Sequence, residues 1–161
     1  MSGPRAGIGF DAHAFAPEGS GRRLVLGGVE FRGERGLAGH SDADVLLHAL
    51  IDALLGAAAL GDIGALFPPA DPRYRDADSR DLLRQAAAAV RAQGLAVANV
   101  DATVIAERPH IAPKLTEMRT AIAGALGIDI ARVSVKATTT DGLGFTGRGE
   151  GIAALAVALL E

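Results

Sequence analysis

A carboxylate and an imidazole stand close together near the start of the chain, in Asp11-Ala12-His13. On an extended strand, residues two positions apart point to the same face, so these two side chains would lie next to each other. Such a pair can bind a metal ion. It is also common as a hydrogen-bonded cap or a solvated strand end, and these residues alone leave both interpretations open.

A second pair lies within a long apolar segment. Between Val45 and Gly61 the only polar side chains are His48 and Asp52, which share one stripe of a helix with Asp44 a turn earlier. A helix that is apolar on nearly all sides is buried, and a buried histidine has to be hydrogen-bonded or bound to a metal. One alternative is an ordinary core histidine that is held by Asp44 or Asp52.

Asp11, His13 and His48 together match a catalytic zinc site. Catalytic zinc ions are bound by three protein ligands and keep one position open, whereas structural zinc ions are usually closed by four. The chain contains no cysteine, which leaves histidines and carboxylates as the strong ligands. Asp44 or Asp52 would then orient the His48 ring from outside the ligand set.

The segment Gly39-His40-Ser41-Asp42 precedes the expected helix. Free N–H groups and the helix dipole favour an anion at such a position. The simpler alternative is a helix cap with an exposed histidine beside it.

A glycine-rich segment near the end of the chain follows the hydroxyl and carboxylate groups of 138–141. Gly142, Gly144 and Gly147 satisfy the spacing of a dinucleotide-binding loop, but too little chain follows for the helix, strand and acidic residue of that motif. The segment is therefore either a flexible hairpin or a loop that contacts phosphate.

Hydrophobic periodicity and turn residues predict the elements that position these groups. We expect strands over 5–15, 23–26, 29–32, 97–106 and 133–137, and helices over 79–93 and 112–126. The longest helix should begin at the Ser41-x-x-Asp44 capping box and end near Gly61. Residues 152–160 suit a helix or a strand. Strands separated by helices predict an α/β or α+β fold with helices on one side of a sheet.

Composition narrows the class of protein. A chain of 161 residues with 49% hydrophobic content suits one packed domain, spanning 1–161. A net charge of -3 gives no basic surface for nucleic acid. Residues 1–5 carry no apolar signal core, and the apolar run at 151–160 is too short to cross a membrane. We therefore expect a cytoplasmic protein, and the many small apolar residues favour a homo-oligomer.

Taken in order, the motifs resemble those of the 2-C-methyl-D-erythritol 2,4-cyclodiphosphate synthase family over essentially the whole chain. The resemblance rests on five blocks in the family's order and approximate spacing: Gly9–His13, Gly39–Asp44, His48–Gly56, Ala59–Gly64 and Lys136–Gly151. It implies a mixed sheet with helices on one face, a final strand over 152–160, and a homotrimer whose active sites lie between adjacent subunits.

The resemblance also implies roles for individual residues. Asp11, His13 and His48 would bind zinc, Asp141 would hold a second ion (Mg²⁺ or Mn²⁺), and His40 and Thr139 would stabilise the transition state. The implied substrate-binding residues are Ser41, Asp62, Ile63, Gly64, Phe67, Asp71, Ala106, Pro109, Ala112, Thr138, Thr140, Phe145 and Arg148. Within that set, 106–112 match a cytidine-binding stretch. Phe145 and Arg148 match positions toward the trimer's centre, where some family members hold an isoprenoid diphosphate.

Two positions depart from the family's pattern. Pro69 replaces an aspartate that often follows Phe-Pro in the family, so this chain lacks that carboxylate. Asp141 stands where many members carry the longer glutamate.

The implied reaction is an intramolecular phosphoryl transfer of the non-mevalonate isoprenoid pathway. The 2-phosphate of 4-diphosphocytidyl-2-C-methyl-D-erythritol 2-phosphate attacks the β-phosphorus of the same molecule, and CMP leaves. Few basic side chains lie in the motif blocks, so metal ions would neutralise the phosphates. Two alternatives remain: a zinc hydrolase that uses a bound water, and a structural trimer with an incidental metal or ligand.

Overall fold

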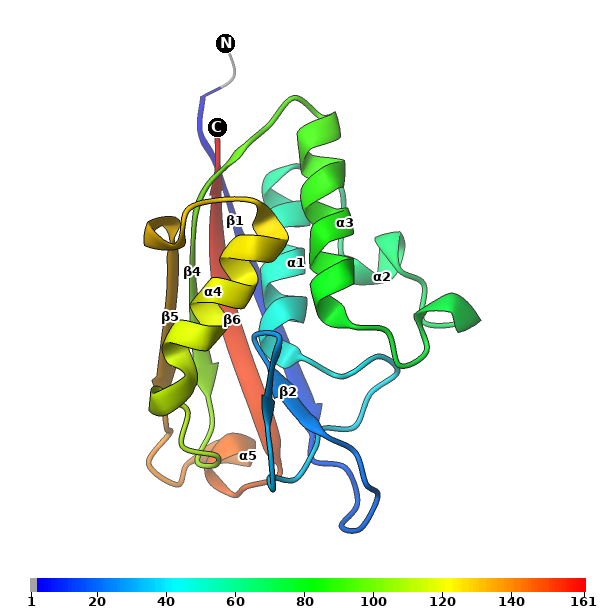
Figure 1. The fold of residues 1–161 in the computed structure, drawn as a ribbon, viewed down its shortest axis with the longest axis vertical. Coiled ribbons are helices and arrows are strands. Elements are labelled where there is room, and N and C mark those ends of the chain that lie inside the picture. Colours follow the sequence, from blue (N-terminus) through cyan, green and yellow to red (C-terminus); the bar gives the residue numbers. More distant parts are fainter. Residues whose placement is uncertain (1–2) are drawn as a thin grey trace.

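The computed structural model describes residues 3–161 and contains a four-stranded mixed sheet (Figure 1). Met1 and Ser2, part of the N-terminal segment without a signal pattern, lie outside the described residues. The strands are β1 (Arg5–Ala14), β4 (Val97–Ile105), β5 (Val133–Thr138) and β6 (Gly151–Leu160), in the order β1-β6-β4-β5. β6 is antiparallel to both neighbours, and β4 and β5 are parallel. The carboxyl ends of β1, β4 and β5 therefore meet at one end of the sheet.

Three helices form a layer on one face of this sheet, as the sequence predicts (Figure 1). α1 (Val45–Ala57) packs against β1 and β6, and α4 (Leu115–Leu126) packs against β5. α3 (Ser79–Ala92) lies outside α1 and contacts α4. On the other face, large apolar side chains of β1 and β6 remain exposed: Ile8, Phe10, Leu155 and Val157.

Two glycines allow α1 to approach β1 closely. A Cβ atom on Gly9 would lie 1.9 Å from the carbonyl oxygen of Ala49, and one on Gly7 would lie 2.0 Å from that of Ala53. Both obstacles are helix backbone, so only glycine fits this contact. The close packing fixes α1, which carries His48, over the strand that carries Asp11 and His13.

Shorter elements complete the chain. β2 (Leu24–Leu26) and β3 (Val29–Phe31) form the expected hairpin at Gly27-Gly28, and α3 and β5 agree with their predicted segments to within a residue. The first turn of the helix expected over 112–126 is the 3₁₀ turn η2 (Ala112–Lys114). The remaining elements were not foreseen in the sequence: α2 (Ile63–Leu66), α5 (Gly144–Gly147), η1 (Pro72–Tyr74) and η3 (Ile130–Arg132).

The predicted start of the long helix is wrong. α1 begins at Val45, and Asp44 is its N-cap, with a carboxylate that accepts a hydrogen bond from the Leu47 N–H. The same carboxylate accepts N–H groups of Gly27 and Gly28, which tie the hairpin to the helix. Burial and the charge of Asp42 raise the pKa of Asp44 to about 7, against the lowering effect of these N–H donors.

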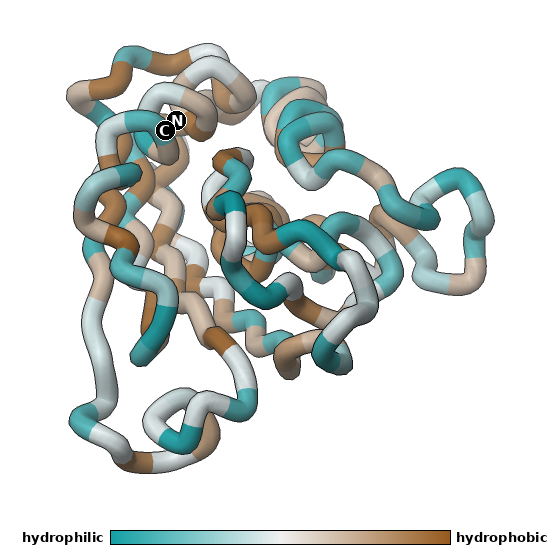
Figure 2. The backbone as a smooth tube through the Cα atoms, turned by 60° about the horizontal axis from the view of Figure 1, so that its bottom comes forward, coloured by the Kyte–Doolittle hydropathy of each residue, from teal (hydrophilic) through white to brown (hydrophobic). Residues whose placement is uncertain are grey.

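The interior is aliphatic. In Figure 2 hydrophobic segments gather toward the middle of the molecule, and the outer loops are mostly hydrophilic. Among the described residues, no helix has the length and apolar character needed to cross a membrane.

Candidate metal site

Three side chains converge where β1 meets α1. Asp11 Oδ2 lies 2.9 Å from His13 Nε2 and 3.0 Å from His48 Nδ1, and the two histidine nitrogens are 3.2 Å apart. One ligand atom of each residue thus forms a nearly regular triangle. The structure confirms that the three residues singled out in the sequence come together.

A metal ion fits this triangle. Four ligands at about 2.0–2.1 Å in a tetrahedron are about 3.3 Å from one another, close to the separations seen here. Two imidazoles and one carboxylate are also ligands of the kind that bind zinc and other divalent ions. Asp11 and His13 are only half-buried, so the cluster can be reached from solvent by a further ligand.

The His13 ring is fixed from behind by the backbone. Its Nδ1 lies 2.7 Å from the carbonyl oxygen of Ala38, an acceptor only, so Nδ1 carries a proton. In the neutral ring Nε2 then offers its lone pair to the site. Gly39 lies against the same ring, since a Cβ atom there would be 3.1 Å from His13 Cε1.

The charges of the cluster are coupled. Burial alone would raise the pKa of Asp11, but hydrogen bonds to His13 and His48 outweigh it and hold that pKa well below its usual range. Burial would lower the pKa of His13, whereas the hydrogen bond and charge of Asp11 raise it. The site therefore keeps a carboxylate anion available for a cation.

His48 is held by hydroxyl groups rather than by the carboxylates expected from the sequence. Its Nε2 lies 3.1 Å from Ser41 Oγ and 3.0 Å from Ser79 Oγ. Asp44 serves as the cap of α1, and Asp52 accepts the Ile63 N–H at 2.7 Å. The predicted role of these two aspartates in orienting His48 is wrong. Both carboxylates accept hydrogen bonds from backbone N–H groups that have no partner within their own helix.

Sequence reasoning missed Ser79. It is fully buried at the start of α3, and it reaches His48 only through the packing of α3 on α1, 31 positions away in the chain. No local pattern relates the two residues, and the serine by itself is typical of a helix start.

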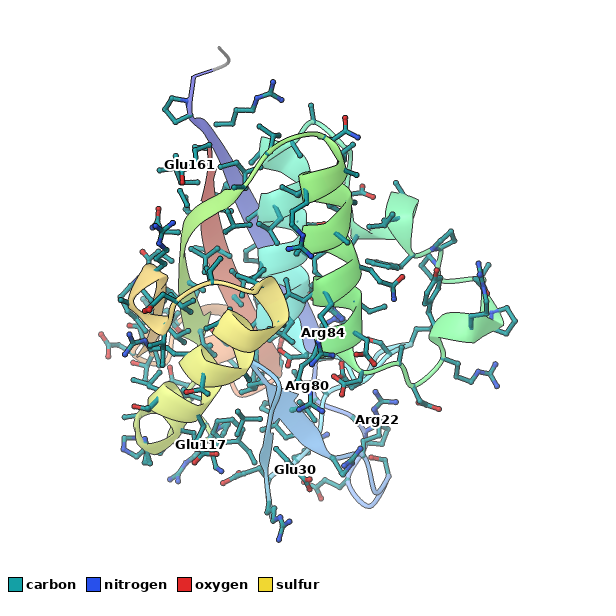
Figure 3. The ribbon with its side chains drawn as sticks, turned by 45° about the horizontal axis from the view of Figure 1, so that its top comes forward. Arg22, Glu30, Arg80, Arg84, Glu117 and Glu161 are labelled. Carbon is teal, nitrogen blue, oxygen red and sulfur yellow. The ribbon has the colours of Figure 1, made fainter. Side chains whose placement is uncertain are left out.

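The segment with His40 and Ser41 leads into the site from outside. His40 is exposed, and its carbonyl oxygen accepts the Asp76 N–H at 2.9 Å. Arg22, near the β2–β3 hairpin in Figure 3, donates to the carbonyl oxygens of Leu37 and Ser41, each at 2.7 Å. The expected anion position at the helix N-terminus is taken by the Asp44 carboxylate, so His40 and Ser41 lie beside the site and not over a free helix end.

A groove of about 690 Å³ lies at the opposite edge of the sheet. It is lined by 106–111 and by 137–139, which include the predicted Ala106, Pro109, Thr138 and Thr139. The Glu107 carboxylate accepts the Thr140 N–H at 3.1 Å and so joins the two walls. Ala112 follows at the start of η2.

The loop after β5 brings exposed polar groups to this groove. Thr139 Oγ1 donates to Asp141 Oδ1 at 3.3 Å, and Thr140 Oγ1 lies 3.1 Å from Thr146 Oγ1. Phe145, on α5, is 39% exposed, and Arg148 is paired with Glu150. The glycine-rich run is thus a turn followed by a short helix and not a hairpin.

The other predicted substrate-binding residues lie around α2 and η1. Asp62 is the N-cap of α2, and Ile63 and Gly64 are half-buried in its first turn. Phe67 is buried with its ring against Tyr74, so its side chain belongs to the core of the single chain. Asp71 caps η1 and pairs with Arg73.

The metal site and the groove share one end of the sheet but not one edge. Asp11 pairs with Ala154, Ala154 with Val104, and Val104 with Ala137, so Asp11 and Ala137 stand in one row across four strands. With strands about 4.8 Å apart, that row is about 14 Å long. Within one chain the two features are therefore separate.

The fold and this geometry define a mixed α/β protein with a candidate site for one metal ion. The YgbB family model matches residues 4–161. A protein of Moorella thermoacetica named 2-C-methyl-D-erythritol 2,4-cyclodiphosphate synthase is 63% identical over 97% of this chain and 94% of its own length. One of the same name from Rubrobacter xylanophilus is 61% identical over 100% of this chain and 97% of its own.

Solved structures agree with these relatives. A Plasmodium falciparum structure described as an IspF CDP complex matches with a TM-score of 0.85 and 33% identity, over 99% of this chain and 97% of that one. The bifunctional IspDF of Campylobacter jejuni matches with a TM-score of 0.92 and 45% identity, over 98% of this chain but only 42% of that longer chain. The chain belongs to the YgbB family, together with the 2-C-methyl-D-erythritol 2,4-cyclodiphosphate synthases.

Proposed function

We propose that this chain converts 4-diphosphocytidyl-2-C-methyl-D-erythritol 2-phosphate into 2-C-methyl-D-erythritol 2,4-cyclodiphosphate and CMP. It would act as a phosphorus–oxygen lyase in the non-mevalonate pathway of isoprenoid precursor biosynthesis. The observation that carries the proposal is the convergence of Asp11, His13 and His48 in a chain 63% identical to a synthase of that name.

We assign zinc to the three-residue site and Mg²⁺ or Mn²⁺ to Asp141. When bound, these ions would act as Lewis acids on the phosphate oxygens. The donor set supports zinc, because two histidines and one carboxylate with an open position are typical of its catalytic sites. The exposed carboxylate of Asp141 is the harder oxygen ligand that magnesium prefers.

The protein's main contribution would be orientation. Nucleophile and electrophile belong to one molecule, and holding them in line can supply several kcal/mol of the barrier. Two phosphate charges about 4 Å apart repel by roughly 4 kcal/mol at an effective dielectric of 20. The exposed His40 imidazole and the Thr139 hydroxyl would donate hydrogen bonds where that charge redistributes.

The substrate would lie between subunits of a homotrimer. The row of about 14 Å between Asp11 and Ala137 separates the metal site from the groove in one chain, so a neighbouring copy's groove would complete each site. The cytidine would occupy the groove at 106–112. The Plasmodium falciparum relative is a CDP complex, which supports a cytidine nucleotide as the ligand. Ser41, Asp62, Ile63, Gly64, Phe67, Asp71, Thr138 and Thr140 would form the rest of the substrate site.

The uncovered sheet face supports such an assembly. Ile8 is paired with Val157 and Phe10 with Leu155, which makes one apolar patch of four side chains, and Ile8 is 71% exposed. A monomer seldom leaves such a patch in water. Phe145 and Arg148 would lie near the trimer's centre, where an isoprenoid diphosphate could bind. We assign the one-domain subunit to the cytoplasm.

Phosphorus NMR tests the reaction. Incubation of the zinc-loaded protein with the cytidyl substrate and Mg²⁺ should yield a cyclic diphosphate and CMP. Linear phosphates would instead identify a zinc hydrolase. Unchanged substrate, from a protein of proven zinc content, would favour a binding or structural role.

Light scattering tests the assembly. At micromolar concentration we expect about three times the chain mass of 16.4 kDa. A monomer mass with full activity would exclude active sites between subunits.

A further inference from the structure

The imidazole of His48 is connected to a carboxylate through a buried serine. Ser79 Oγ lies 3.0 Å from His48 Nε2 and, on its other side, donates to Asp42 Oδ1 at 2.5 Å. Asp42 Oδ2 also accepts the Ser79 N–H at 2.9 Å, and Oδ1 accepts the Asp44 N–H at 3.1 Å. Asp42 thus lies in a fixed position behind Ser79.

The direction of these hydrogen bonds follows from their chemistry. An ionised carboxylate only accepts, so the Ser79 hydroxyl proton has to point to Asp42. Ser79 Oγ is then an acceptor toward His48, and the proton between them belongs to Nε2. A neutral imidazole carries one proton, which leaves the lone pair on Nδ1, the atom that lies 3.0 Å from Asp11.

We propose that Ser79 and Asp42 are positioning residues that hold the His48 proton on Nε2 and so turn the Nδ1 lone pair toward the metal. Their role matches that of the Ala38 carbonyl behind His13, which holds the other ring in its metal-binding form. Outer partners of this kind orient histidine ligands and raise metal affinity. The proposal rests on the metal site of the proposed function but not on its substrate or reaction.

Ser41 offers a matched comparison, because its hydroxyl touches the same nitrogen at 3.1 Å. It accepts the Ala43 N–H at 3.2 Å, but among residues 3–161 no carboxylate binds its proton. Ser41 can therefore donate to Nε2 as well as accept from it. Without Ser79, the ring could place its proton on Nδ1, facing Asp11, while Ser41 donates to Nε2.

The first test is the tautomer of His48 in the metal-free wild-type protein. Nitrogen NMR of ¹⁵N-histidine protein at alkaline pH distinguishes a protonated from an unprotonated ring nitrogen. The four histidines are assigned with His40→Gln, His110→Gln and His13→Gln variants, and the remaining ring is His48. We expect the His48 proton on Nε2 in the wild-type protein, and a proton on Nδ1 would overturn the proposal.

The second test compares zinc affinity in Ser79→Ala and Ser41→Ala by chelator competition. Ser79→Ala should weaken binding by about 10- to 100-fold and shift the metal-free ring toward the Nδ1–H form. Ser41→Ala should lose clearly less zinc affinity and keep the wild-type tautomer, because Ser79 Oγ still accepts the hydrogen bond from His48 Nε2–H. Equal losses in the two variants would overturn the assignment to Ser79. Circular dichroism of the metal-free proteins verifies that both variants fold.

The outcome is separable from that of the proposed function. Weaker zinc binding in Ser79→Ala, together with no cyclic product from the wild type, would reject the proposed reaction and support the positioning role of Ser79. Cyclic product from the wild type, together with unchanged zinc affinity in Ser79→Ala, would support the proposed reaction and reject the positioning role of Ser79.

Discussion

The two edges of the sheet contrast in how they hold their polar groups. At the β1 edge His48 is nearly buried, and every imidazole nitrogen of His13 and His48 has a partner within 3.2 Å. At the β5 edge Thr139 and Asp141 are exposed and bond mainly to each other, at 3.3 Å. The groups of the first site are held in place by the fold, whereas those of the second are open to solvent.

This difference has a physical origin. The three residues of the candidate metal site project from a strand and a helix that pack closely together, so their positions are set by the fold itself. The groups at the β5 edge sit on a loop that continues into Gly142 and Gly144, where the backbone adapts at little cost. Substitutions at the β1 edge should therefore act on metal content and stability, and those at the β5 edge on turnover.

The largest effect is expected when both histidine ligands are removed. His13→Ala/His48→Ala should lose stoichiometric zinc and all measurable turnover, because one carboxylate cannot hold the ion. Metal analysis of the folded variant measures its zinc content, and product formation measures its turnover. Stoichiometric zinc in that variant would place the site elsewhere.

A substitution at a residue that does not contact the metal should also lower stability and zinc binding at the β1 edge. Gly9→Ala places a methyl group 1.9 Å from the Ala49 carbonyl oxygen, which is helix backbone and cannot rotate away. We expect a loss of about 3 kcal/mol in the free energy of unfolding, measured by urea denaturation, and weaker zinc binding as α1 moves off β1.

Gly56→Ala is the control for this prediction, because a Cβ atom at Gly56 meets nothing within 4 Å. There the same change should stabilise α1 by about 0.5–1 kcal/mol. Similar stability of the two variants would mean that the contact between α1 and β1 tolerates a side chain.

At the β5 edge, Thr139→Val should lower turnover and leave the fold intact. A hydroxyl aimed at the reacting phosphate acts mainly as charge redistributes, so kcat should fall by a factor that corresponds to about 2 to 4 kcal/mol, with little change in KM. Steady-state kinetics measure both, and Thr120→Val on the exposed side of α4 should match the wild type. A raised KM with unchanged kcat would reassign Thr139 to ground-state binding.

The smallest effect is expected at Asp141. Its carboxylate is one methylene shorter than glutamate, and magnesium tolerates little distortion, so a shifted loop or a bridging water has to close the gap. Asp141→Glu should therefore tighten the apparent Mg²⁺ affinity by a modest factor in a titration of turnover at saturating substrate and constant zinc. If the turnover of Asp141→Ala depends on Mg²⁺ concentration as that of the parent does, the second ion is held by another residue.

The sequence by itself determined the main elements and the identity of the metal-site residues. The alternation in β1 put Asp11 and His13 on one face, and a single histidine in an apolar helix marked His48 as buried and bonded. These inferences succeed because spacing along one element fixes direction. Residues 152–160, which suit either element by composition, became a strand because β6 fills the centre of the sheet between β1 and β4.

Only the tertiary structure decided which groups surround the ligands. Sequence reasoning assigned Asp44 and Asp52 to His48 because they lie near it on the helix. In the structure their carboxylates instead accept hydrogen bonds from the N–H groups of Gly27, Leu47 and Ile63. Ser79 reaches His48 from another helix, and the groove at the β5 edge joins two segments about 30 residues apart. Hydrogen bonds between elements depend on how helices pack on the sheet, which periodicity within one element does not encode.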